Sequence, residues 1–321
     1  MKAIAQDRYG SADVLRSVDI DVPMVGDKDV LVRVHAVSVN IGDWHMMTGL
    51  PYLVRLAGPR RPRGRVRGMD VAGTVDRVGA QVTGFSVGDE VFGICEGSLA
   101  EYAVARADKL AHKPAGIGFE EAAVVPVSAV TALQGVRSLE QVSAGERVLI
   151  LGASGAVGGY AVQLASAFGA QVTGVASAAK LDYVRSLGAD VVLDYASTDV
   201  TRTGERYDLV LDTAGNRAIS SLRRLLAPRG RLVIVGGEGG GSVTGGFGRS
   251  LRALLMSPFV SQTLTGLVSV VTADDLRTLA GLLESGKIRP VIDDSYPLAE
   301  AATAMRRLTD GSVRGKLVVT P

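Results

Sequence analysis

The feature that most constrains the fold of this chain of 321 residues is a glycine-rich turn near its middle. Residues 147–151 (R-V-L-I-L) are typical of a buried strand, and they lead directly into G-A-S-G-A-V-G at residues 152–158. Apolar residues then recur at three- and four-residue steps as far as Phe168, and Gly169 follows as a stop, which predicts a helix. The chain is therefore expected to pass from a strand through a tight turn into a helix.

A turn of this kind can bind a phosphate group. The N-terminus of a helix offers free backbone N–H donors and the positive end of the helix dipole, and glycines allow close approach. The spacing here is G-x-x-G-x-x-G, whereas the usual dinucleotide fingerprint is G-x-G-x-x-G, so a turn without a ligand is the alternative. The strand–turn–helix context favours a nucleotide site.

Strands and helices alternate after this turn. Apolar runs at residues 171–175, 191–193, 209–211 and 231–235 are separated by helical segments such as 179–187. Repeated βα units predict an α/β fold with a parallel, doubly wound sheet. After Gly246 we expect this order to break down into an apolar stretch as far as Val271. Helices at 274–285 and 299–308 and strands near Val291 and at 316–320 are expected to follow, outside the βα pattern.

The first part of the chain is β-rich. Residues 30–39, 71–78 and 90–93 have the pattern of short strands separated by turns, and the composition becomes Ala/Val-rich and helical at 120–135. The length favours two domains. We predict one domain formed by residues 1–122 and 268–321, with a cofactor domain of residues 123–267 inserted between these parts.

Composition excludes several classes of protein. The net charge of +2 argues against recruitment of nucleic acid or a membrane surface by bulk electrostatics. No apolar run approaches the roughly 20 residues of a membrane span, and the start of the chain lacks the apolar core of a signal peptide. We therefore expect a cytoplasmic protein. The single cysteine, Cys95, excludes an internal disulfide framework and a cysteine-rich zinc site.

The end of the second strand of the cofactor domain indicates which dinucleotide binds. In such folds a carboxylate about 20 residues after the glycine turn binds the ribose 2′-OH and selects NAD. Residues 175–180 (V-A-S-A-A-K) contain no carboxylate, whereas the Ser177 hydroxyl and the Lys180 ammonium can donate to a 2′-phosphate. This favours NADP(H). Lys180 as a solvated helix residue is the alternative, and Ser177 as a helix N-cap is compatible with phosphate binding.

An ordered series of motifs resembles the medium-chain dehydrogenase/reductase superfamily. It comprises residues 68–79 (G-M-D-V-A-G-T-V-D-R-V-G), 88–93 (G-D-E-V-F-G), 97–102 (G-S-L-A-E-Y), the glycine turn and 314–319 (R-G-K-L-V-V). The resemblance covers essentially the whole chain. It implies a GroES-like catalytic domain, a Rossmann cofactor domain, an active site in the interdomain cleft, and a homodimer or homotetramer.

The chain departs from the zinc alcohol dehydrogenases of this superfamily at the zinc ligands. Asn40 stands where they have the first zinc cysteine, Met69 stands where they have a histidine, and the third ligand position falls at Val127. The four-cysteine structural lobe is also missing. The S-V-N stretch at 38–40 and G-x-D at 68–70 are similar to the zinc-free NADPH:quinone oxidoreductase (zeta-crystallin-like) branch, which implies a site without metal.

The resemblance also implies which residues contact NADP(H). The contacts to the 2′-phosphate would be Ser177, Lys180 and Tyr195, and Asn40 and Thr131 would lie near the nicotinamide. The remaining expected contacts come from two glycine-containing turns: Gly152, Ser154, Gly155, Ala156, Val157, Gly158, Gly236 and Gly237.

Chemistry without zinc favours hydride transfer to a quinone or an α,β-unsaturated carbonyl compound. The anion formed is delocalised, with a basicity near that of a phenol (pKa about 10), so water can protonate it. We predict Asn40 and Thr131 as polar positioning residues, Trp44 as a pocket wall and Tyr52 as a proton donor. Trp44 is equally consistent with core packing, and Tyr52 with an ordinary surface or core position. Asp43 and Asp70 are expected to organise loops around the cleft.

Two other functions stay open at this point. They are a metal-free NADP-dependent alcohol dehydrogenase and an NADPH-binding structural or regulatory protein with little turnover.

The role of one basic loop is also open. The loop contains Arg60, Arg61, Arg63, Arg65 and Arg67. This loop is interpreted as a solvated loop, or as a basic rim for an acidic or CoA-linked substrate. A nucleic-acid contact is a third interpretation, but the loop lacks the interleaved aromatic residues that such contacts use.

Overall fold

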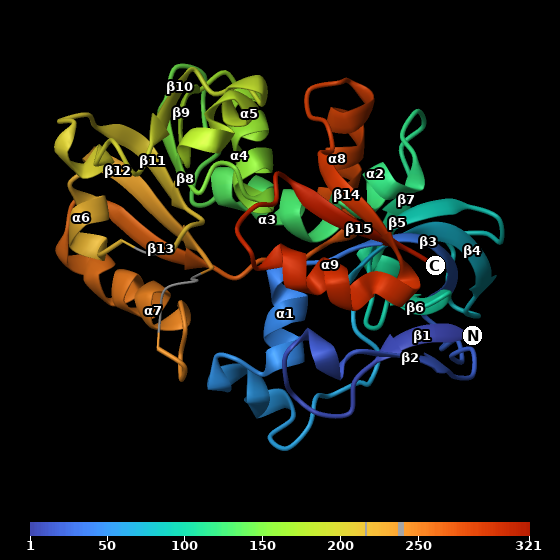
Figure 1. Cartoon of the computed structure of the whole chain (residues 1–321). Helices are drawn as coiled ribbons and strands as arrows, with labels where there is room; N and C mark the ends of the chain where they lie inside the picture. The colour runs from blue at the N-terminus through green and yellow to red at the C-terminus, as the bar shows by residue number, and fades with distance from the viewer. Residues whose placement is uncertain (216, 237–240) are drawn as a thin grey trace. The chain divides into compact units, whose positions relative to one another are not determined.

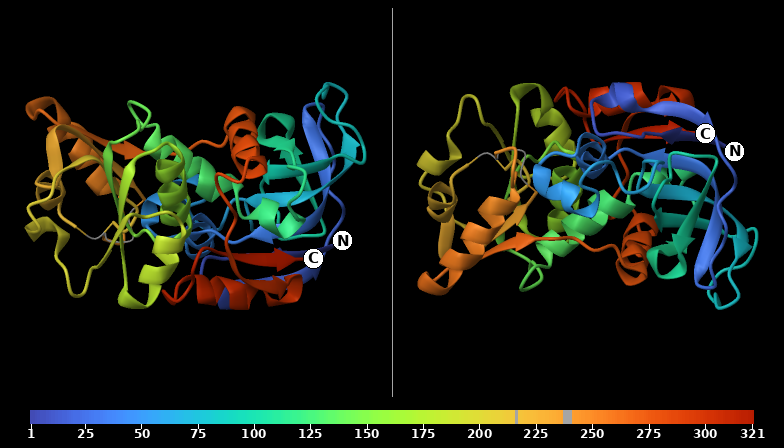
Figure 2. Two further views of the ribbon diagram at one scale, coloured as in Figure 1. Left: turned by 90° about the horizontal axis from the view of Figure 1, so that it is seen from above. Right: turned by 90° about the horizontal axis from the view of Figure 1, so that it is seen from below.

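The computed structural model describes residues 1–215, 217–236 and 241–321, and the chain divides into two compact units. Unit 1 consists of Met1–Val130 and Val271–Pro321, and unit 2 of Thr131–Val270. Both ends of the chain therefore belong to unit 1, as the terminal labels in Figures 1 and 2 show. Within the described residues, no helix is both long and apolar enough to cross a membrane.

Unit 1 is built around a largely antiparallel sheet. In the described chain this sheet has the order β14-β15-β3-β4-β5-β7, with β6 also pairing with β3, and β1 and β2 form a separate pair. The bounds are β1 (Lys2–Ala5), β2 (Arg16–Asp19), β3 (Asp29–Ser38), β4 (Asp70–Val78), β5 (Glu90–Ile94), β6 (Tyr102–Arg106), β7 (Leu110–His112), β14 (Ile292–Pro297) and β15 (Lys316–Thr320).

Alternate residues of these strands form the core of unit 1. Val30, Val32 and Val34 of β3 are buried together with Leu317 and Val319 of β15, because alternate residues of a strand point to the same face. The helical segments are η1 (Ala12–Val14), α1 (Ile41–Thr48), η2 (Tyr52–Ala57), η3 (Ala107–Lys109), α2 (Phe119–Ala123), α3 (Pro126–Val136), α8 (Ala273–Glu284), η7 (Leu298–Glu300) and α9 (Ala301–Leu308). The division between the units falls inside α3.

Unit 2 contains a parallel sheet with the strand order β10-β9-β8-β11-β12-β13 among the described residues. The bounds are β8 (Arg147–Leu151), β9 (Gln171–Ala176), β10 (Val191–Asp194), β11 (Tyr207–Asp212), β12 (Leu226–Val235) and β13 (Thr263–Leu267). Counted along the chain, this order is 3-2-1-4-5-6, which is the order of a doubly wound dinucleotide-binding sheet. The predicted α/β fold with a parallel, doubly wound sheet is confirmed.

The helices of unit 2 lie against this sheet. They are α4 (Ala156–Ala167), η4 (Ala178–Lys180), α5 (Leu181–Ser186), η5 (Val200–Arg202), α6 (Ile219–Arg223), α7 (Phe247–Met256) and η6 (Ser257–Phe259). Helix α4 packs on β8 and β9, α5 on β9 and β10, and α7 on β13, as can be followed in Figure 1.

The expectation that the βα order ends at Gly246 is wrong. Helix α7 and strand β13 add a further βα unit, and β13 pairs in parallel with β12 through Val233 and Thr265. Strand β13 has the sequence T-L-T-G-L and buries only Leu264 fully. It lies at the edge of the sheet, so it lacks the continuous apolar run by which buried strands are recognised.

Candidate active site

The glycine turn lies at the carboxyl end of β8, between the neighbouring strands β9 and β11. Two hydrogen bonds tie it to these neighbours. The Ala153 N–H donates to the Val175 carbonyl at 3.0 Å, and the Thr213 hydroxyl donates to the Leu151 carbonyl at 2.7 Å. After β8 the chain adds β9 and β10 on one side of this strand, and it then returns to add β11 on the other side. The carboxyl end of β8 is therefore the switch point at which such sheets bind ligands.

The glycines of the turn have different roles. Gly152 has a φ of 78°, which favours glycine. A Cβ on Gly158 would lie 2.1 Å from the Gly152 carbonyl oxygen, so this glycine lets α4 begin directly against the turn. A Cβ on Gly155, the exposed N-cap, would come no closer than 3.4 Å to any atom. Space is therefore present in front of the helix.

This geometry fits the pyrophosphate of a dinucleotide. The first turn of α4, from Ala156 to Gly158, carries backbone N–H groups that the helix itself does not use. The first intrahelical bond runs from the Gly159 N–H to the Gly155 carbonyl at 2.8 Å. Ser154 lies half-buried in the same turn. Donors and helix dipole thus converge where the glycines leave the approach open.

The three residues expected at the 2′-phosphate lie together at the ends of β9 and β10. Ser177 occupies the N-cap position of η4, and its side chain makes no capping hydrogen bond. The Lys180 N–H donates to the Ser177 carbonyl at 2.9 Å, and the Tyr195 N–H donates to the Ala176 carbonyl at 3.1 Å. Backbone bonds therefore bring these three residues to one corner of the sheet.

The other residues expected in unit 2 are positioned as follows. Gly236 follows β12 with a φ of 72°, and a Cβ there would meet no atom within 4 Å. Thr131 is half-buried on α3. Gly237 lies outside the described residues.

Unit 1 contains a cluster of polar side chains that is almost completely buried. We call it the polar cluster: Ser38, Asn40, Asp43, Asp70 and Lys316, none of which is more than 5% exposed. Its members come from the ends of three adjacent strands, β15, β3 and β4, and from the start of α1.

Strand register explains why these residues meet. Val318 of β15 pairs with Ser38 of β3, and the same antiparallel register extended by two residues puts Lys316 opposite Asn40. Ala36 pairs with Ala72 of β4, and the same extension puts Ser38 opposite Asp70.

Asp70 is the centre of the polar cluster. Its Oδ2 accepts hydrogen bonds from the Ser38 hydroxyl, from Asn40 Nδ2 at 2.9 Å and from Lys316 Nζ at 3.3 Å. Its Oδ1 accepts from the Val127 N–H at 2.9 Å. Lys316 also donates to Asn40 Oδ1. The Asn40 amide is thereby fixed, with its oxygen toward the ammonium and its nitrogen toward the carboxylate.

Two of the three positions at which the alcohol dehydrogenases have zinc ligands are bonded to Asp70. Asn40 donates from Nδ2 and Val127 from its N–H, and Met69, at the third position, precedes Asp70 in the chain. Zinc prefers cysteine, histidine and carboxylate ligands, whereas these positions supply an amide, a thioether and an apolar side chain. In the parts of the chain that the structure describes, no group of three or more such ligands could hold a metal ion.

Burial shifts the ionisation of the cluster. It raises the pKa of the Asp43 carboxyl to about 6, and the nearby Asp70 carboxylate contributes to the rise. Burial lowers the pKa of the Lys316 ammonium, while Asp70 and Asp43 counteract this. The pKa of the Cys95 thiol is raised by burial and by the same carboxylates, so this cysteine does not supply a thiolate.

Asp43 organises the start of α1, in line with its expected role in a loop. Its carboxylate accepts a hydrogen bond from the N–H of Asn40, the N-cap residue, at 2.9 Å. This bond caps the start of the helix. Asp43 thus holds the Asn40 backbone, while Asp70 and Lys316 hold its side chain.

The side chains of Trp44 and Tyr52 make none of the hydrogen bonds described for the polar cluster, although the Trp44 N–H donates to the Asn40 carbonyl at 3.2 Å. Trp44 is partly buried against the core of unit 1, and its ring meets His45 edge-on with centroids 5.2 Å apart. Tyr52 is 49% exposed, and the Arg55 guanidinium lies 4.9 Å from the centre of its ring.

Sequence reasoning did not identify Lys316 as part of this site. A charged residue at the first position of an otherwise apolar strand, K-L-V-V-T, was the available signal. Its partner Asn40 is 276 positions away along the chain, so only the pairing of β15 with β3 reveals the contact. Thr213, whose hydroxyl supports the glycine turn, was missed for the same reason.

Comparison with known proteins agrees with both units. Residues 26–135 match the alcohol dehydrogenase GroES-like domain, and residues 187–319 match the family described as zinc-binding dehydrogenase. The chain is 32% identical to a chloroplast envelope quinone oxidoreductase homolog of Arabidopsis thaliana, over 100% of this chain and 98% of that protein.

Two further proteins are similar along the whole chain. An NADPH-dependent alkenal/one oxidoreductase of Arabidopsis thaliana is 34% identical over 100% of this chain and 80% of its own length. The crystal structure of Escherichia coli quinone oxidoreductase complexed with NADPH superposes with a TM-score of 0.85 at 26% identity and covers 100% of both chains. The chain therefore belongs to the quinone oxidoreductase branch of the medium-chain dehydrogenase/reductase superfamily.

Proposed function

We propose that this protein reduces quinones or α,β-unsaturated carbonyl compounds with NADPH and without a metal ion. The observation that carries the proposal is the polar cluster, in which the amide of Asn40, at a zinc-ligand position, is bonded to the Lys316 ammonium and to the Asp70 carboxylate. The names of the relatives, which are quinone oxidoreductases and an alkenal/one oxidoreductase, support the same class of acceptor.

The glycine turn and the corner of Ser177, Lys180 and Tyr195 are proposed to hold the cofactor. The N–H groups at the start of α4 would bind the pyrophosphate, and the Ser177 hydroxyl and Lys180 ammonium would donate to the 2′-phosphate. When bound, the reduced nicotinamide supplies the hydride. The NADPH in the related crystal structure supports this choice of cofactor.

The protein's own contribution is to position the acceptor and to exclude water. We propose Asn40 and Thr131 near the nicotinamide. Both ends of the Asn40 amide are bonded within the polar cluster, so we assign this residue to a rigid wall of the site rather than to a donor for the acceptor. No strong acid is needed, because water can protonate an anion with the basicity of a phenol (pKa about 10). Tyr52 remains a proposed alternative donor.

An acceptor assay tests the reaction. NADPH oxidation is followed with a quinone, an enone and an aldehyde, each with and without a metal chelator. We expect turnover with the quinone or the enone that the chelator does not change. Tight NADPH binding without turnover would contradict the enzyme assignment, and chelator-sensitive alcohol oxidation would contradict the metal-free one.

A substitution tests the cofactor corner. Lys180→Ala should raise the KM for NADPH about tenfold or more, because one charge-assisted hydrogen bond contributes on the order of 1.5–3 kcal/mol. The KM for NADH should change little. Lys287→Ala, at an exposed lysine in unit 1, is the matched control. Equal effects on both cofactors would remove the assignment of the 2′-phosphate.

We also propose that the protein forms a homodimer, or a homotetramer built from such dimers, through unit 2. Large apolar side chains on and after α7 are more than half exposed: Phe247, Leu251, Leu254, Leu255 and Phe259. Exposed apolar groups gathered in this way are typical of interfaces. Strand β13 beside them is an edge of the sheet, and an edge strand can pair with a second chain.

A further inference from the structure

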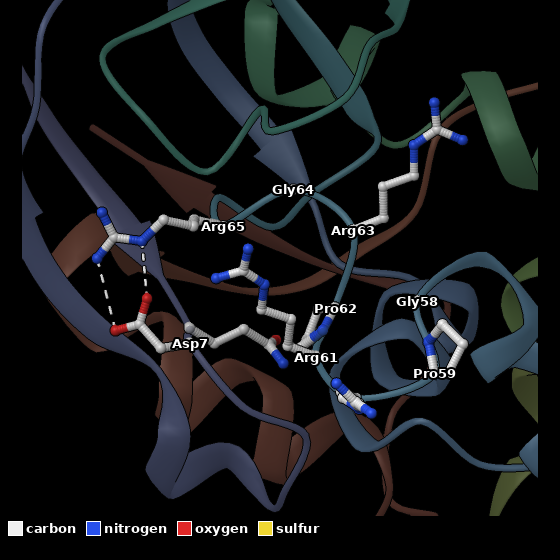
Figure 3. A pocket seen from close by; sticks show the side chains of 10 residues that line it. Asp7, Gly58, Pro59, Arg61, Pro62, Arg63, Gly64 and Arg65 are labelled. Carbon is white, nitrogen blue, oxygen red and sulfur yellow. Dashed lines mark hydrogen bonds and ion pairs between the residues drawn. The ribbon is translucent and has the colours of Figure 1, made fainter.

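The basic loop of the sequence forms one side of an open cavity in unit 1. Gln6, Asp7 and residues 58–65 line this cavity, which has a volume of about 830 Å³, and we call it the arginine cavity. Figure 3 shows it from close by. The lining contains four arginines against one aspartate, a surplus of three positive charges.

Two arginines of the loop have structural partners. Arg65 Nε forms an ion pair with Asp7 Oδ1 at 2.7 Å. Arg67, which is 5% exposed, donates from Nη2 to the carbonyl oxygens of Arg63, at 3.2 Å, and Gly64. These two side chains therefore hold the loop in place.

The other three arginines have no such role. Arg60, Arg61 and Arg63 are exposed, and no ion pair joins any of them to another residue in the described chain. In Figure 3, Arg61 lies next to the Arg65–Asp7 pair, and Arg63 extends away from it. Like charges gathered on one short loop repel one another. A bound anion would remove this repulsion.

The backbone of the loop is held in place on both sides of these arginines. The Tyr9 hydroxyl donates to the Gly58 carbonyl at 2.7 Å, and the Gln6 N–H donates to the Arg65 carbonyl at 2.9 Å. A loop anchored at both ends presents its guanidinium groups at a lower entropic cost of binding than a free loop does.

The amide of Gln6 is a fixed part of the lining of the arginine cavity. Gln6 is 2% exposed, and its Nε2 donates to the carbonyls of Arg8 and Met47 at 3.0 Å each. Its Oε1 is buried, so a ligand in the open cavity contacts the arginines rather than this oxygen.

We propose that the arginine cavity binds the phosphate or pyrophosphate group of an organic ligand. Guanidinium groups bind phosphate through paired, charge-assisted hydrogen bonds, and the three exposed arginines match a multiply charged anion. The residues of the arginine cavity all belong to unit 1, whereas those of the glycine turn and the Ser177 corner belong to unit 2. The inference does not depend on turnover of any acceptor.

Calorimetry with inorganic pyrophosphate tests this site. The protein is first saturated with NADP⁺ so that the proposed cofactor site is filled. The variant Arg60→Gln/Arg61→Gln/Arg63→Gln is compared with Arg16→Gln/Arg206→Gln/Arg229→Gln, which removes the same charge from exposed positions elsewhere. Thermal unfolding verifies that both are folded.

We expect one molecule of pyrophosphate to bind to the wild type and to the control. Binding to the loop variant should be at least about tenfold weaker. Absence of binding to the saturated wild type, equal affinity in the loop variant, or an equal loss in the control would each overturn the proposal.

Kinetics distinguish two sources of the phosphate. If it belongs to the acceptor, the loop variant should raise the KM for a phosphate-bearing enone and leave that for a neutral enone unchanged. If it belongs to a separate small molecule, both KM values should stay unchanged while pyrophosphate binding is still lost. A loss of NADPH affinity in the loop variant would instead assign the arginines to the cofactor and overturn the proposal.

Discussion

At the scale of single residues, the Lys316 ammonium is the positive charge of the polar cluster. It is bonded to Asn40 and Asp70 in an environment that water does not reach. Removing one partner of a buried ion pair leaves the other charge uncompensated, which costs about 3–5 kcal/mol. Lys316→Met should therefore lower the free energy of unfolding by about this amount, as measured by denaturant titration.

The interaction with Asp70 can be isolated. The double variant Lys316→Met/Asp70→Asn should lose less stability than the sum of the two single variants, by about 0.5–3 kcal/mol. Lys287→Met removes an exposed lysine and should change stability by less than about 0.5 kcal/mol. Additive effects of the two cluster substitutions would contradict the pairing.

Asp43 should make stability depend on pH. Its pKa is raised from 3.8 to about 6 in the folded protein, so between these values the folded state binds a proton that the unfolded state has released. The stabilisation is fully present below the unfolded pKa and is lost as the pH rises through about 6. At about 1.4 kcal/mol per pKa unit, the loss is roughly 3 kcal/mol at most.

The measurement compares the wild type with Asp43→Asn, which keeps an acceptor for the Asn40 N–H. The free energy of unfolding is determined between about pH 3 and 7, a range that includes both the unfolded and the folded pKa of Asp43. The wild type should lose stability relative to the variant as the pH rises. A difference that is independent of pH would show that Asp43 is not the titrating group.

At the scale of elements, two glycines of the turn allow packing and ligand binding to be tested separately. A Cβ on Gly158 would lie 2.1 Å from the Gly152 carbonyl oxygen, whereas one on Gly155 would stay at 3.4 Å. Gly158→Ala should lower the free energy of unfolding without cofactor by about 1–3 kcal/mol. Gly155→Ala should leave stability nearly unchanged and weaken NADPH binding, because its methyl group enters the space in front of α4.

Thermal unfolding and cofactor titration together test this difference. If Gly155→Ala binds NADPH as tightly as the wild type does, the pyrophosphate does not rest at this turn. If Gly158→Ala is as stable as the wild type, the close approach of α4 to the turn is not needed for packing.

The elements also show which parts of the fold can be predicted from sequence. Strand β8 and helix α4 were predicted because their apolar periods are local and the glycine turn marks the boundary between them. Strand β13 was not, because an edge strand that contains Thr263, Thr265 and Gly266 resembles a loop in composition. The residues of the candidate site are brought together by contacts between positions that are far apart in the sequence, such as Lys316 with Asn40. A local sequence pattern does not predict such contacts.

At the scale of the whole molecule, unit 1 is formed by the two ends of the chain and unit 2 by its middle. The polar cluster depends on this arrangement, since β15 comes from the C-terminal segment while β3 and β4 come from the N-terminal one. Each unit contributes its own part of the proposed chemistry. The cofactor residues belong mainly to unit 2, and the polar cluster belongs to unit 1.

The apolar surface of α7 predicts the assembly. Leu251, Leu254 and Leu255 are exposed on this helix, which packs on the edge strand β13. Leu251→Arg/Leu255→Arg should convert the assembly to monomers, since a desolvated charge without a partner opposes association. The mass measured by light scattering after size exclusion should fall by about half for a dimer.

A control and a cofactor measurement complete this test. Met24→Arg places a charge on another exposed apolar residue, in unit 1, and should leave the mass unchanged. NADPH affinity should survive in the monomer, because the glycine turn and the Ser177 corner use residues of a single chain. A wild type that is monomeric at micromolar concentration, or a variant that keeps its mass, would show that this surface does not join two copies.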